Sequence, residues 1–196
     1  MRIIGGNLRG KKILSPTDKS TRPLKDIVRE SIFNIIEHSK NEFVNLNSAK
    51  VLDLFSGTGS FGIECLSRGA EKVIFFENYT NSIKVLKKNL ELLKLNKYSK
   101  IIEKDSYNIS QSQLNLKNFD LIFLDPPFKD NKINQLIEII KKMKITSKDT
   151  LIIIHRKKRI TENISKDLKS KITDLWKEEN LINVLMPLSI DRKSVV

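Results

Sequence analysis

The residues best suited to chemistry lie between positions 120 and 128, where an apolar strand runs into a polar turn. Residues 121–124 are all apolar, and four residues of different character follow: Asp125, Pro126, Pro127 and Phe128. A carboxylate accepts hydrogen bonds from an amino group, prolines restrict the backbone, and an aromatic ring can stack on a flat base. The pattern predicts that these four residues hold a nucleobase by its exocyclic amino group. The alternative is that the prolines end a strand and that Phe128 packs in the core.

A glycine-rich segment earlier in the chain predicts a cofactor site. Gly57, Gly59 and Gly62 lie between a predicted strand and a predicted helix, and Glu77 follows 20 residues after the first glycine. This spacing is typical of dinucleotide sites, which bind pyrophosphate at the helix N-terminus. Asp53 lies four residues before the first glycine, and a carboxylate there disfavours pyrophosphate and favours an ammonium group. S-adenosylmethionine carries an ammonium group and no phosphate, so we expect it as the cofactor, with NAD as the alternative.

Polar residues after the second and third predicted strands extend the cofactor site. Glu77 ends the second strand, where its carboxylate can accept hydrogen bonds from both hydroxyls of a ribose. Asp105 and Ser106 follow the third strand, where a carboxylate or a backbone N–H can meet the edge of an adenine. The neighbouring Phe55 and Asn78 are assigned to the same site. The alternatives are that Glu77 caps a helix and that Asp105 is solvated.

Alternating strands and helices must position these residues. From residue 50 onward, short apolar segments alternate with segments of helical periodicity, which predicts a parallel sheet with helices on both faces. In such sheets ligands bind at the carboxyl ends of the strands where the strand order reverses, so we expect Asp53 and Asp125 to meet at one site. We predict strands at 51–55, 72–76, 101–103, 121–124, 151–154 and 181–185, and helices at 61–68, 81–95, 133–143 and 160–168.

Residues 1–48 are predicted to form a basic extension that precedes the α/β domain, residues 49–196. Glycines indicate a hairpin over residues 3–14, and Asp26 is placed to begin a helix that ends near residue 37. Residues 1–30 carry eight Lys and Arg residues against three Asp and Glu residues, which favours contact with phosphates. The alternative is compositional drift in an AT-rich genome. We expect six residues to contact nucleic acid, the last two nearest the site: Arg2, Arg9, Lys11, Lys12, Arg22 and Arg29.

The bulk composition excludes several classes of protein. The chain has 196 residues, of which 39% are hydrophobic and 30% charged, and its formal net charge is +13. Such a chain can bury a core and is not expected to be disordered. No apolar run approaches the length of a membrane span and no signal peptide is recognisable, so we expect a cytoplasmic protein. Cys65 is the only cysteine, which excludes an internal disulfide and a cysteine-based zinc site. We expect no metal, and nothing requires more than a monomer.

With these motifs in place, the chain resembles the bacterial 16S ribosomal RNA guanine-N2 methyltransferases. The resemblance covers residues 2–34, 51–77 and 119–128, and includes Asp-Leu-Phe-Ser-Gly-Thr-Gly at 53–59 and Asp-Pro-Pro-Phe at 125–128. It implies a Rossmann-like class I methyltransferase fold with a mostly parallel, seven-stranded sheet and S-adenosylmethionine as the cofactor. It also implies methylation of the N2 atom of one guanine, with 16S rRNA or the assembling 30S subunit as the partner. The loop glycines and acidic residues would hold the cofactor, and residues 125–128 would hold the guanine.

The chain departs from this family at three places, and two other functions stay open. Leu24 and Lys25 follow Thr-Arg-Pro where the family usually has a second threonine, Ile154-His155 stands where many members have Glu-His, and the last forty residues match poorly. The first alternative is a DNA adenine-N6 methyltransferase, which would normally need an additional target-recognition domain. The second is a non-catalytic RNA-binding assembly factor on a methyltransferase scaffold.

Overall fold

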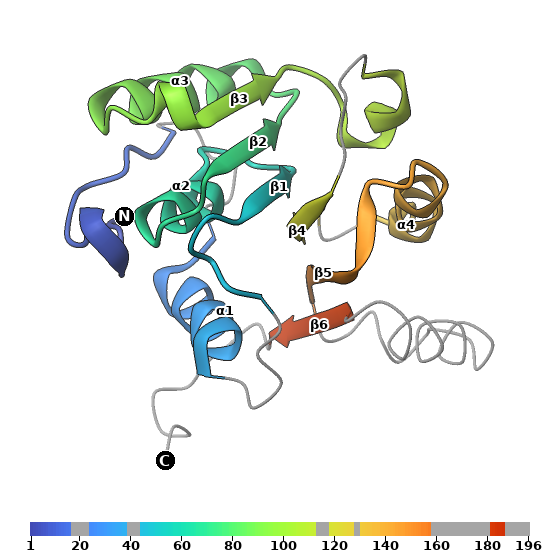
Figure 1. The fold of residues 1–196 in the computed structure, drawn as a ribbon. Helices are drawn as coiled ribbons and strands as arrows, with labels where there is room; N and C mark the ends of the chain where they lie inside the picture. The colour runs from blue at the N-terminus through green and yellow to red at the C-terminus, as the bar shows by residue number, and fades with distance from the viewer. Residues whose placement is uncertain (17–23, 39–43, 113–117, 128–129, 158–180, 187–196) are drawn as a thin grey trace.

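Six parallel strands form one sheet in the computed structural model, which describes residues 1–16, 24–38, 44–112, 118–127, 130–157 and 181–186. The strand order is β3-β2-β1-β4-β5-β6, and every neighbouring pair is parallel. The order reverses between β1 and β4, which therefore lie side by side at the centre (Figure 1). The strands are β1 (Lys50–Leu54), β2 (Lys72–Phe76), β3 (Ser99–Ile102), β4 (Phe119–Leu124), β5 (Thr146–Lys157) and β6 (Leu181–Met186).

Helices cover both faces of the sheet because successive residues of the central strands point to opposite sides and are apolar on both. Val51 and Phe123 belong to one buried cluster, whereas Leu52 and Leu124 belong to the other. Three helices pack on the first face: α1 (Asp26–His38), α2 (Ser60–Ser67) and α3 (Thr80–Leu92). The second face is covered by α4 (Ile133–Lys142) and the short 3-10 helix η3 (Ser106–Gln111). This three-layer arrangement confirms the α/β fold predicted from the sequence.

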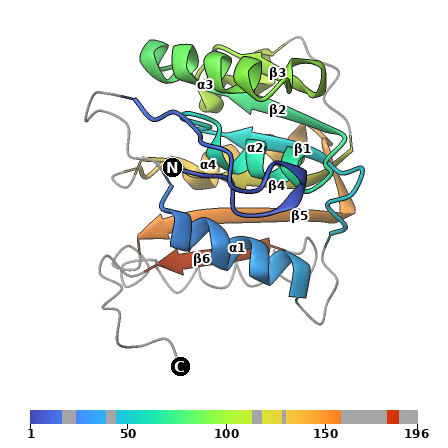
Figure 2. The ribbon, with the colours of Figure 1, turned by 90° about the vertical axis from the view of Figure 1, so that its left-hand side faces the viewer.

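The N-terminal segment folds back on itself over α2 (Figure 2). It turns at the 3-10 helix η1 (Gly6–Leu8), and a single antiparallel bridge joins Arg2 to Lys12. Ile3 and Ile13 are buried in the same cluster as the apolar face of α1 and the central strands. The described parts of the first 48 residues therefore contribute to the main core, and the domain boundary at residue 48 stays a prediction.

The predicted elements differ from the structure mainly at their ends. Helix α3 ends at Leu92 rather than at residue 95, and β5 is longer than the apolar run that predicted it, because its first residues pair alongside Phe119. A seventh strand is not among the described residues, and the helix predicted at 160–168 lies outside them. Within the described residues, no helix is both long and apolar enough to cross a bilayer.

Candidate active site

The loop that follows β1 has the backbone conformation of a ligand-binding turn. Phe55, Gly57 and Gly59 all have positive φ angles, of 61°, 56° and 81°. A Cβ atom added at Gly59 would lie 2.3 Å from Leu86 Cδ1, so this glycine is needed for close packing of α3 on the loop. A Cβ atom at Gly57 would meet no atom within 4 Å, so the loop is open on that side. The structure thus separates a packing glycine from one that faces open space, where a cofactor can approach.

Asp53 lies at the carboxyl end of β1 and points toward the first turn of α2. Its side chain is 1% exposed, and Gly62 N–H donates to Asp53 Oδ2 at 3.0 Å. Burial raises the pKa of Asp53 well above its usual range, and the negative charges of Asp125 and Glu77 raise it further. A cation at this position would be stabilised by the carboxylate and would lower that pKa again.

Glu77 binds the glycine loop through its side chain. Gly57 N–H donates to Glu77 Oε2 at 2.6 Å, and Asn78 N–H and Tyr79 N–H donate to Glu77 Oε1 at 3.0 and 2.8 Å. The carboxylate therefore joins the end of β2 to the loop after β1 and precedes the N-terminus of α3. Two carboxylate oxygens offer about four acceptor sites, so a further acceptor position remains for a ribose hydroxyl. Asn78 and Tyr79 precede α3, which begins at Thr80, so these contacts hold the segment before the helix, and the cofactor role of Glu77 stays a prediction.

Ser106 and Tyr107 close the site on the side of β3. Ser106 is buried, and its hydroxyl accepts a hydrogen bond from Phe55 N–H at 3.1 Å. Asp105 accepts a hydrogen bond from Tyr107 N–H at 3.0 Å and so caps η3. Its carboxylate therefore has a protein partner in addition to solvent. The rings of Phe55 and Tyr107 meet edge to face, with centroids 5.4 Å apart. These partly exposed rings offer an apolar surface beside the glycine loop.

Asp125 lies directly after β4, next to the end of β1. Asp125 N–H donates to Leu54 O at 3.4 Å, which fixes the turn against the glycine loop. Asp125 Oδ1 lies 2.7 Å from Nδ1 of His155, a residue of β5. Pro126 is buried and Pro127 exposed, whereas Phe128 lies outside the described residues. The expected meeting of Asp53 and Asp125 is supported by their adjacent strands and by the effect of Asp125 on the Asp53 pKa.

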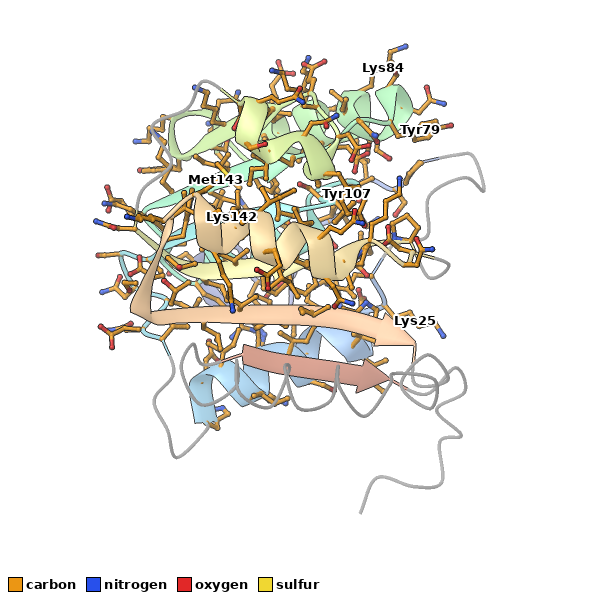
Figure 3. The ribbon with its side chains drawn as sticks, turned by 90° about the vertical axis from the view of Figure 1, so that its right-hand side faces the viewer. Lys25, Tyr79, Lys84, Tyr107, Lys142 and Met143 are labelled. Atoms are coloured by element: carbon orange, nitrogen blue, oxygen red, sulfur yellow. The ribbon has the colours of Figure 1, made fainter. Side chains whose placement is uncertain are left out.

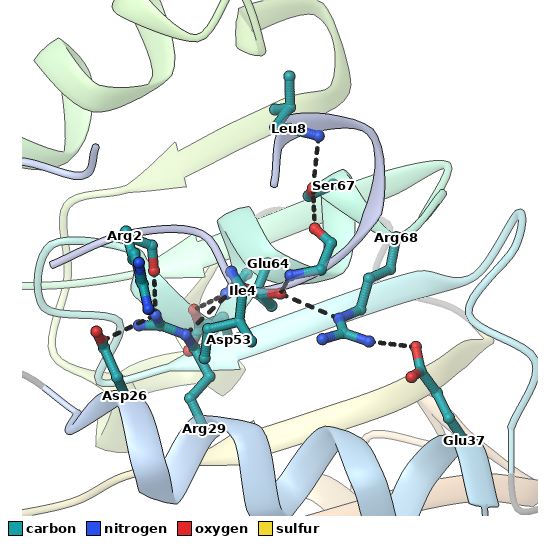
Figure 4. Close-up of polar contacts among 12 residues, drawn as sticks. Arg2, Ile4, Leu8, Asp26, Arg29, Glu37, Asp53, Glu64, Ser67 and Arg68 are labelled. Carbon is teal, nitrogen blue, oxygen red and sulfur yellow. Dashed lines mark hydrogen bonds and ion pairs between the residues drawn. The ribbon is translucent and has the colours of Figure 1, made fainter. Parts of the chain in front are cut away.

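The basic N-terminal residues fall into exposed and buried groups. Arg2, Arg9, Lys11 and Lys12 are exposed on the folded-back segment, and Arg22 lies outside the described residues. Arg29 is 0% exposed: its guanidinium donates to Asp26 Oδ1 at 3.0 Å and to the backbone oxygen of Arg2 (Figure 4).

A phosphate contact by Arg29 does not fit this burial. The guanidinium of Arg29 is enclosed between α1 and α2, where it pairs with Glu64. Glu64 in turn accepts from Ile4 N–H and Gly5 N–H at 2.9 and 2.6 Å and pairs with Arg68. Arg29 therefore attaches the N-terminal segment to the α/β core, because a buried charge is stable only when it is paired.

Three polar contacts near the site were not expected from the sequence. His155 was left without a role, although its place at the end of an apolar strand beside Asp125 was a usable signal. The Tyr107 hydroxyl donates a hydrogen bond to Asp130 Oδ2, which joins η3 to the segment after the Pro-Pro turn. Asn89 accepts from Leu14 N–H at 2.8 Å and donates to Thr58 O at 3.1 Å, so it joins the N-terminal segment to the glycine loop. No periodicity in the sequence points to either of these last two contacts.

The residues present fit a nucleoside cofactor that carries an ammonium group. Asp53 supplies a buried carboxylate, Glu77 an acceptor at the tip of β2, and Gly57 an open backbone. Among the described residues, no group of three or more His, Cys, Asp or Glu side chains could hold a metal ion. A parallel sheet with a glycine loop after its first strand and acidic residues at the tips of β1, β2 and β4 is the Rossmann-like arrangement of methyltransferases.

Comparisons with known proteins agree with this class and identify the family. Two solved structures, described as the putative methyltransferase yhhF of Escherichia coli and the putative methylase HI0767 of Haemophilus influenzae, superpose with TM-scores of 0.62 and 0.60. Their sequence identities are 28% and 34%, over 76% and 77% of this chain and 75% and 78% of theirs. The family model described as Conserved hypothetical protein 95 matches residues 1–178.

A curated relative of Haemophilus influenzae called ribosomal RNA small subunit methyltransferase D is 34% identical over 81% of this chain and 79% of its own. The Escherichia coli protein of the same name is 30% identical over 72% of this chain and 67% of its own. The chain therefore belongs to the Conserved hypothetical protein 95 family, the family of ribosomal RNA small subunit methyltransferase D.

Proposed function

We propose that this protein transfers a methyl group from S-adenosylmethionine to the exocyclic N2 atom of one guanine in 16S rRNA. The substrate is either the RNA itself or the assembling 30S subunit, and the enzyme acts in the cytoplasm as a monomer. The observation that carries the proposal is the placement of Asp53 and Asp125 at the adjoining carboxyl ends of β1 and β4. One carboxylate is positioned for the amine of the methyl donor and the other for the amino group of the acceptor. The names of the curated relatives support the class of substrate.

The cofactor side of the site has a residue for each part of the donor. Asp53 pairs with the ammonium group, Glu77 accepts from a ribose hydroxyl at its remaining acceptor position, and Gly57 leaves room for the donor to approach the backbone. Phe55 and Tyr107 offer their rings to the adenine, next to Asp105 and Ser106. S-adenosylmethionine, when bound, supplies an electrophilic methyl group.

The base side of the site must activate a weak nucleophile. The lone pair of the guanine amino group is delocalised into the ring. Hydrogen-bond acceptors placed to receive both N–H groups rotate the nitrogen out of conjugation and free its lone pair. Asp125 accepts a hydrogen bond from one N–H group, and the backbone carbonyl near Pro126 accepts a hydrogen bond from the other. Asp125 also takes the proton that the nitrogen releases once it is methylated. The ring of Phe128 stacks on the base, which must leave its helix to reach the site.

The exposed N-terminal residues extend the site toward the RNA backbone. Leu8 N–H donates to Ser67 Oγ at 2.9 Å, so the turn of the N-terminal segment lies at the C-terminal end of α2. An α-helix of eight residues is about 12 Å long, so Arg9 lies roughly that far from the glycine loop at the other end of α2. Arg9 is therefore placed to contact phosphates at a distance from the target base, and its contribution is to binding.

Methyl transfer to defined substrates tests the proposal. Labelled methyl groups are expected to enter 16S rRNA from cells that lack this protein, at one guanosine identified by mass mapping, and not to enter DNA or protein. Label in DNA adenine would support a DNA methyltransferase instead, and no label in any substrate would support a non-catalytic assembly factor.

Asp125 is tested by two substitutions at that position and by a control substitution in β4. Asp125→Asn and Asp125→Ala are expected to bind the cofactor normally and to lower transfer at least about 100-fold, the typical lower range for loss of general acid–base and orienting effects. Asp120→Asn is the control, because Asp120 lies at the opposite end of β4, where it accepts from Lys50 N–H at 2.7 Å. Transfer at the wild-type rate in both Asp125 variants would remove this residue from the mechanism.

A further inference from the structure

His155 and Asp125 form a hydrogen-bonded pair at the ends of two adjacent strands. His155 Nδ1 lies 2.7 Å from Asp125 Oδ1, within the range of a charge-assisted hydrogen bond. The side chain of His155 is 9% exposed, whereas that of Asp125 is 22% exposed. The imidazole is thus enclosed by the protein, and the carboxylate that it contacts is partly open to the site.

The strand register accounts for this contact. Leu124 pairs with Ile154 in the parallel ladder between β4 and β5. Asp125 is the first residue after β4 and His155 follows Ile154 in β5, so the two residues lie next to each other just beyond the last paired residues. The register of the two strands therefore brings the two side chains within reach of each other at the end of the ladder.

We propose that His155 is a positioning residue for methyl transfer: its Nδ1–H donates to Asp125 Oδ1 and directs Asp125 Oδ2 toward the amino group of the acceptor base. The inference rests on the proposed function, because it names what orients the carboxylate used there. A free aspartate side chain rotates about two bonds, and only some of its orientations bring an oxygen to the acceptor nitrogen. One fixed hydrogen bond to Oδ1 leaves Oδ2 as the remaining acceptor in a defined place.

The proton balance of the reaction leaves His155 unchanged. The lone pair of the amino nitrogen forms the new N–C bond as the C–S bond breaks and its electron pair passes to sulfur. The nitrogen then loses one N–H proton to Asp125 Oδ2, and the electrons of that N–H bond become the nitrogen lone pair. His155 keeps its Nδ1 proton throughout, which separates a positioning role from a proton relay.

The tautomer of His155 is tested in the free protein, without substrate. In ¹⁵N-labelled protein, NMR is expected to show His155 with its proton on Nδ1, and the Asp125→Ala variant is expected to lose this preference. An unprotonated Nδ1 in the wild-type protein would overturn the proposal, because the imidazole could not then donate to Asp125. This measurement needs no methyl transfer, so its result is independent of the proposed function.

Three substitutions of His155 test the positioning role in the reaction. Asn places its amide nitrogen at the same distance along the side chain as Nδ1, whereas Gln places it one bond further and Ala has no donor. His155→Ala and His155→Gln are expected to lower kcat about 10- to 100-fold, the range for a small misplacement of a catalytic group, with an unchanged KM for the methyl donor. His155→Asn is expected to recover kcat to within about 5-fold of the wild type.

The outcomes separate this inference from the proposed function. Wild-type kcat in His155→Ala, or a His155→Asn variant that binds the methyl donor and is as slow as His155→Ala, would overturn the positioning role. Thermal unfolding of all variants identifies any that fail to fold, and the NMR result then decides alone. A wild-type protein that methylates no guanine while its His155 carries the proton on Nδ1 would overturn the proposed function and leave the pair established.

Discussion

The guanidinium of Arg29 lies against the carboxylate of Glu64, with Arg29 Nε 3.4 Å from Glu64 Oε2 and neither side chain exposed to solvent. This pair joins α1 to α2, the helix that begins at the glycine loop. Burial lowers the pKa of Arg29, and the charges of Glu64 and Asp26 oppose that shift, so the guanidinium stays charged. The pair is therefore a structural connection between the N-terminal segment and the cofactor site.

Removing Arg29 is expected to destabilise the fold. Breaking a buried ion pair by truncating one partner typically lowers the free energy of unfolding by about 3–5 kcal/mol. Arg68 still contacts Glu64 through its Nε at 3.1 Å, so we expect Arg29→Ala to lower the free energy of unfolding by about 3 kcal/mol, the lower end of this range, as measured by urea unfolding. Arg9→Ala, an exposed control on the same segment, is expected to change stability by less than about 0.5 kcal/mol. Equal stability of the two variants would show that the Arg29 pair contributes nothing.

The pKa of Asp53 predicts a pH dependence in the protein without its cofactor. Because burial, with Asp125 and Glu77, raises the folded-state pKa above the unfolded value, ionisation of Asp53 disfavours the folded state. The protonated Asp53 carboxyl therefore favours the folded state. This stabilisation is complete at pH values below the unfolded carboxyl pKa of about 3.9, and it is lost as the pH rises through the folded-state pKa. Asp53→Asn keeps an acceptor for Gly62 N–H and removes the charge, so it is expected to raise the melting temperature at pH 8 and to weaken cofactor binding.

The same carboxylate is expected to release a proton when the cofactor binds. An ammonium group beside Asp53 favours the ionised form and lowers the raised pKa. Titration calorimetry with S-adenosylmethionine in two buffers of different ionisation enthalpy measures this release, and Asp53→Asn should abolish it. An identical binding enthalpy in both buffers would show that Asp53 does not change its protonation on binding.

Glu77 is expected to matter for both stability and cofactor affinity. Its two oxygens accept from three backbone N–H groups, at Gly57, Asn78 and Tyr79, and hydrogen bonds to charged groups contribute about 1.5–3 kcal/mol each. In Glu77→Gln the amide NH₂ would face one of these donors, so we expect a loss of about 1–3 kcal/mol in stability and of about 10-fold or more in cofactor affinity. Glu71→Gln is the control, because Glu71 is exposed just before β2. Calorimetry and urea unfolding would contradict the prediction if the two variants behaved alike.

The exposed N-terminal residues are expected to set the salt dependence of RNA binding. Each phosphate contact on single-stranded nucleic acid contributes about 0.7 to the slope of log affinity against log salt concentration. Replacing Arg9, Lys11 and Lys12 by Gln should therefore flatten the slope by up to about 2, while kcat at saturating RNA stays within about 2-fold. An unchanged slope would show that these residues do not touch phosphate.

Lys142 and Lys144 provide the control for that measurement. Both are exposed near the C-terminal end of α4. Figure 3 places Lys142 toward the end of the molecule where β5 begins, away from the carboxyl ends of the strands, to which Tyr79 lies closer. Neutralising these two lysines removes two positive charges from the face of the sheet that α4 covers, opposite to the face on which the N-terminal segment packs, and is expected to leave the slope unchanged.

Much of the sheet could be predicted from the sequence because its strands are marked by local composition. The apolar run 121–124 is typical of a strand buried on both faces, and Gly57 and Gly59 after β1 have positive φ angles that other residues disfavour. A parallel sheet with these two features has its strand order reversed between them. The adjacency of Asp53 and Asp125 therefore followed from general rules, without knowledge of any side-chain contact.

The misplacement of Arg29 shows how a local signal can be overlooked. Arg29 precedes Ile32, Phe33 and Ile36 by three, four and seven residues, the spacing of one helix face, and those three residues are buried. The periodicity thus placed Arg29 on the apolar face of α1, where a cation needs a buried partner. That partner, Glu64, is 35 residues further along the chain, and no local pattern identifies it.

The sequence by itself determined the order of the elements, the glycine loop and the acidic residues at the strand ends, because these depend on residues close together in the chain. Only the tertiary structure decided which distant polar groups meet: His155 with Asp125, Glu64 with the backbone of Gly5, and Asn89 with the backbone of Leu14. Each pair is brought together by strand register or helix packing. The free energy of such a contact depends on burial and geometry, which arise only once the sheet and its helices have assembled.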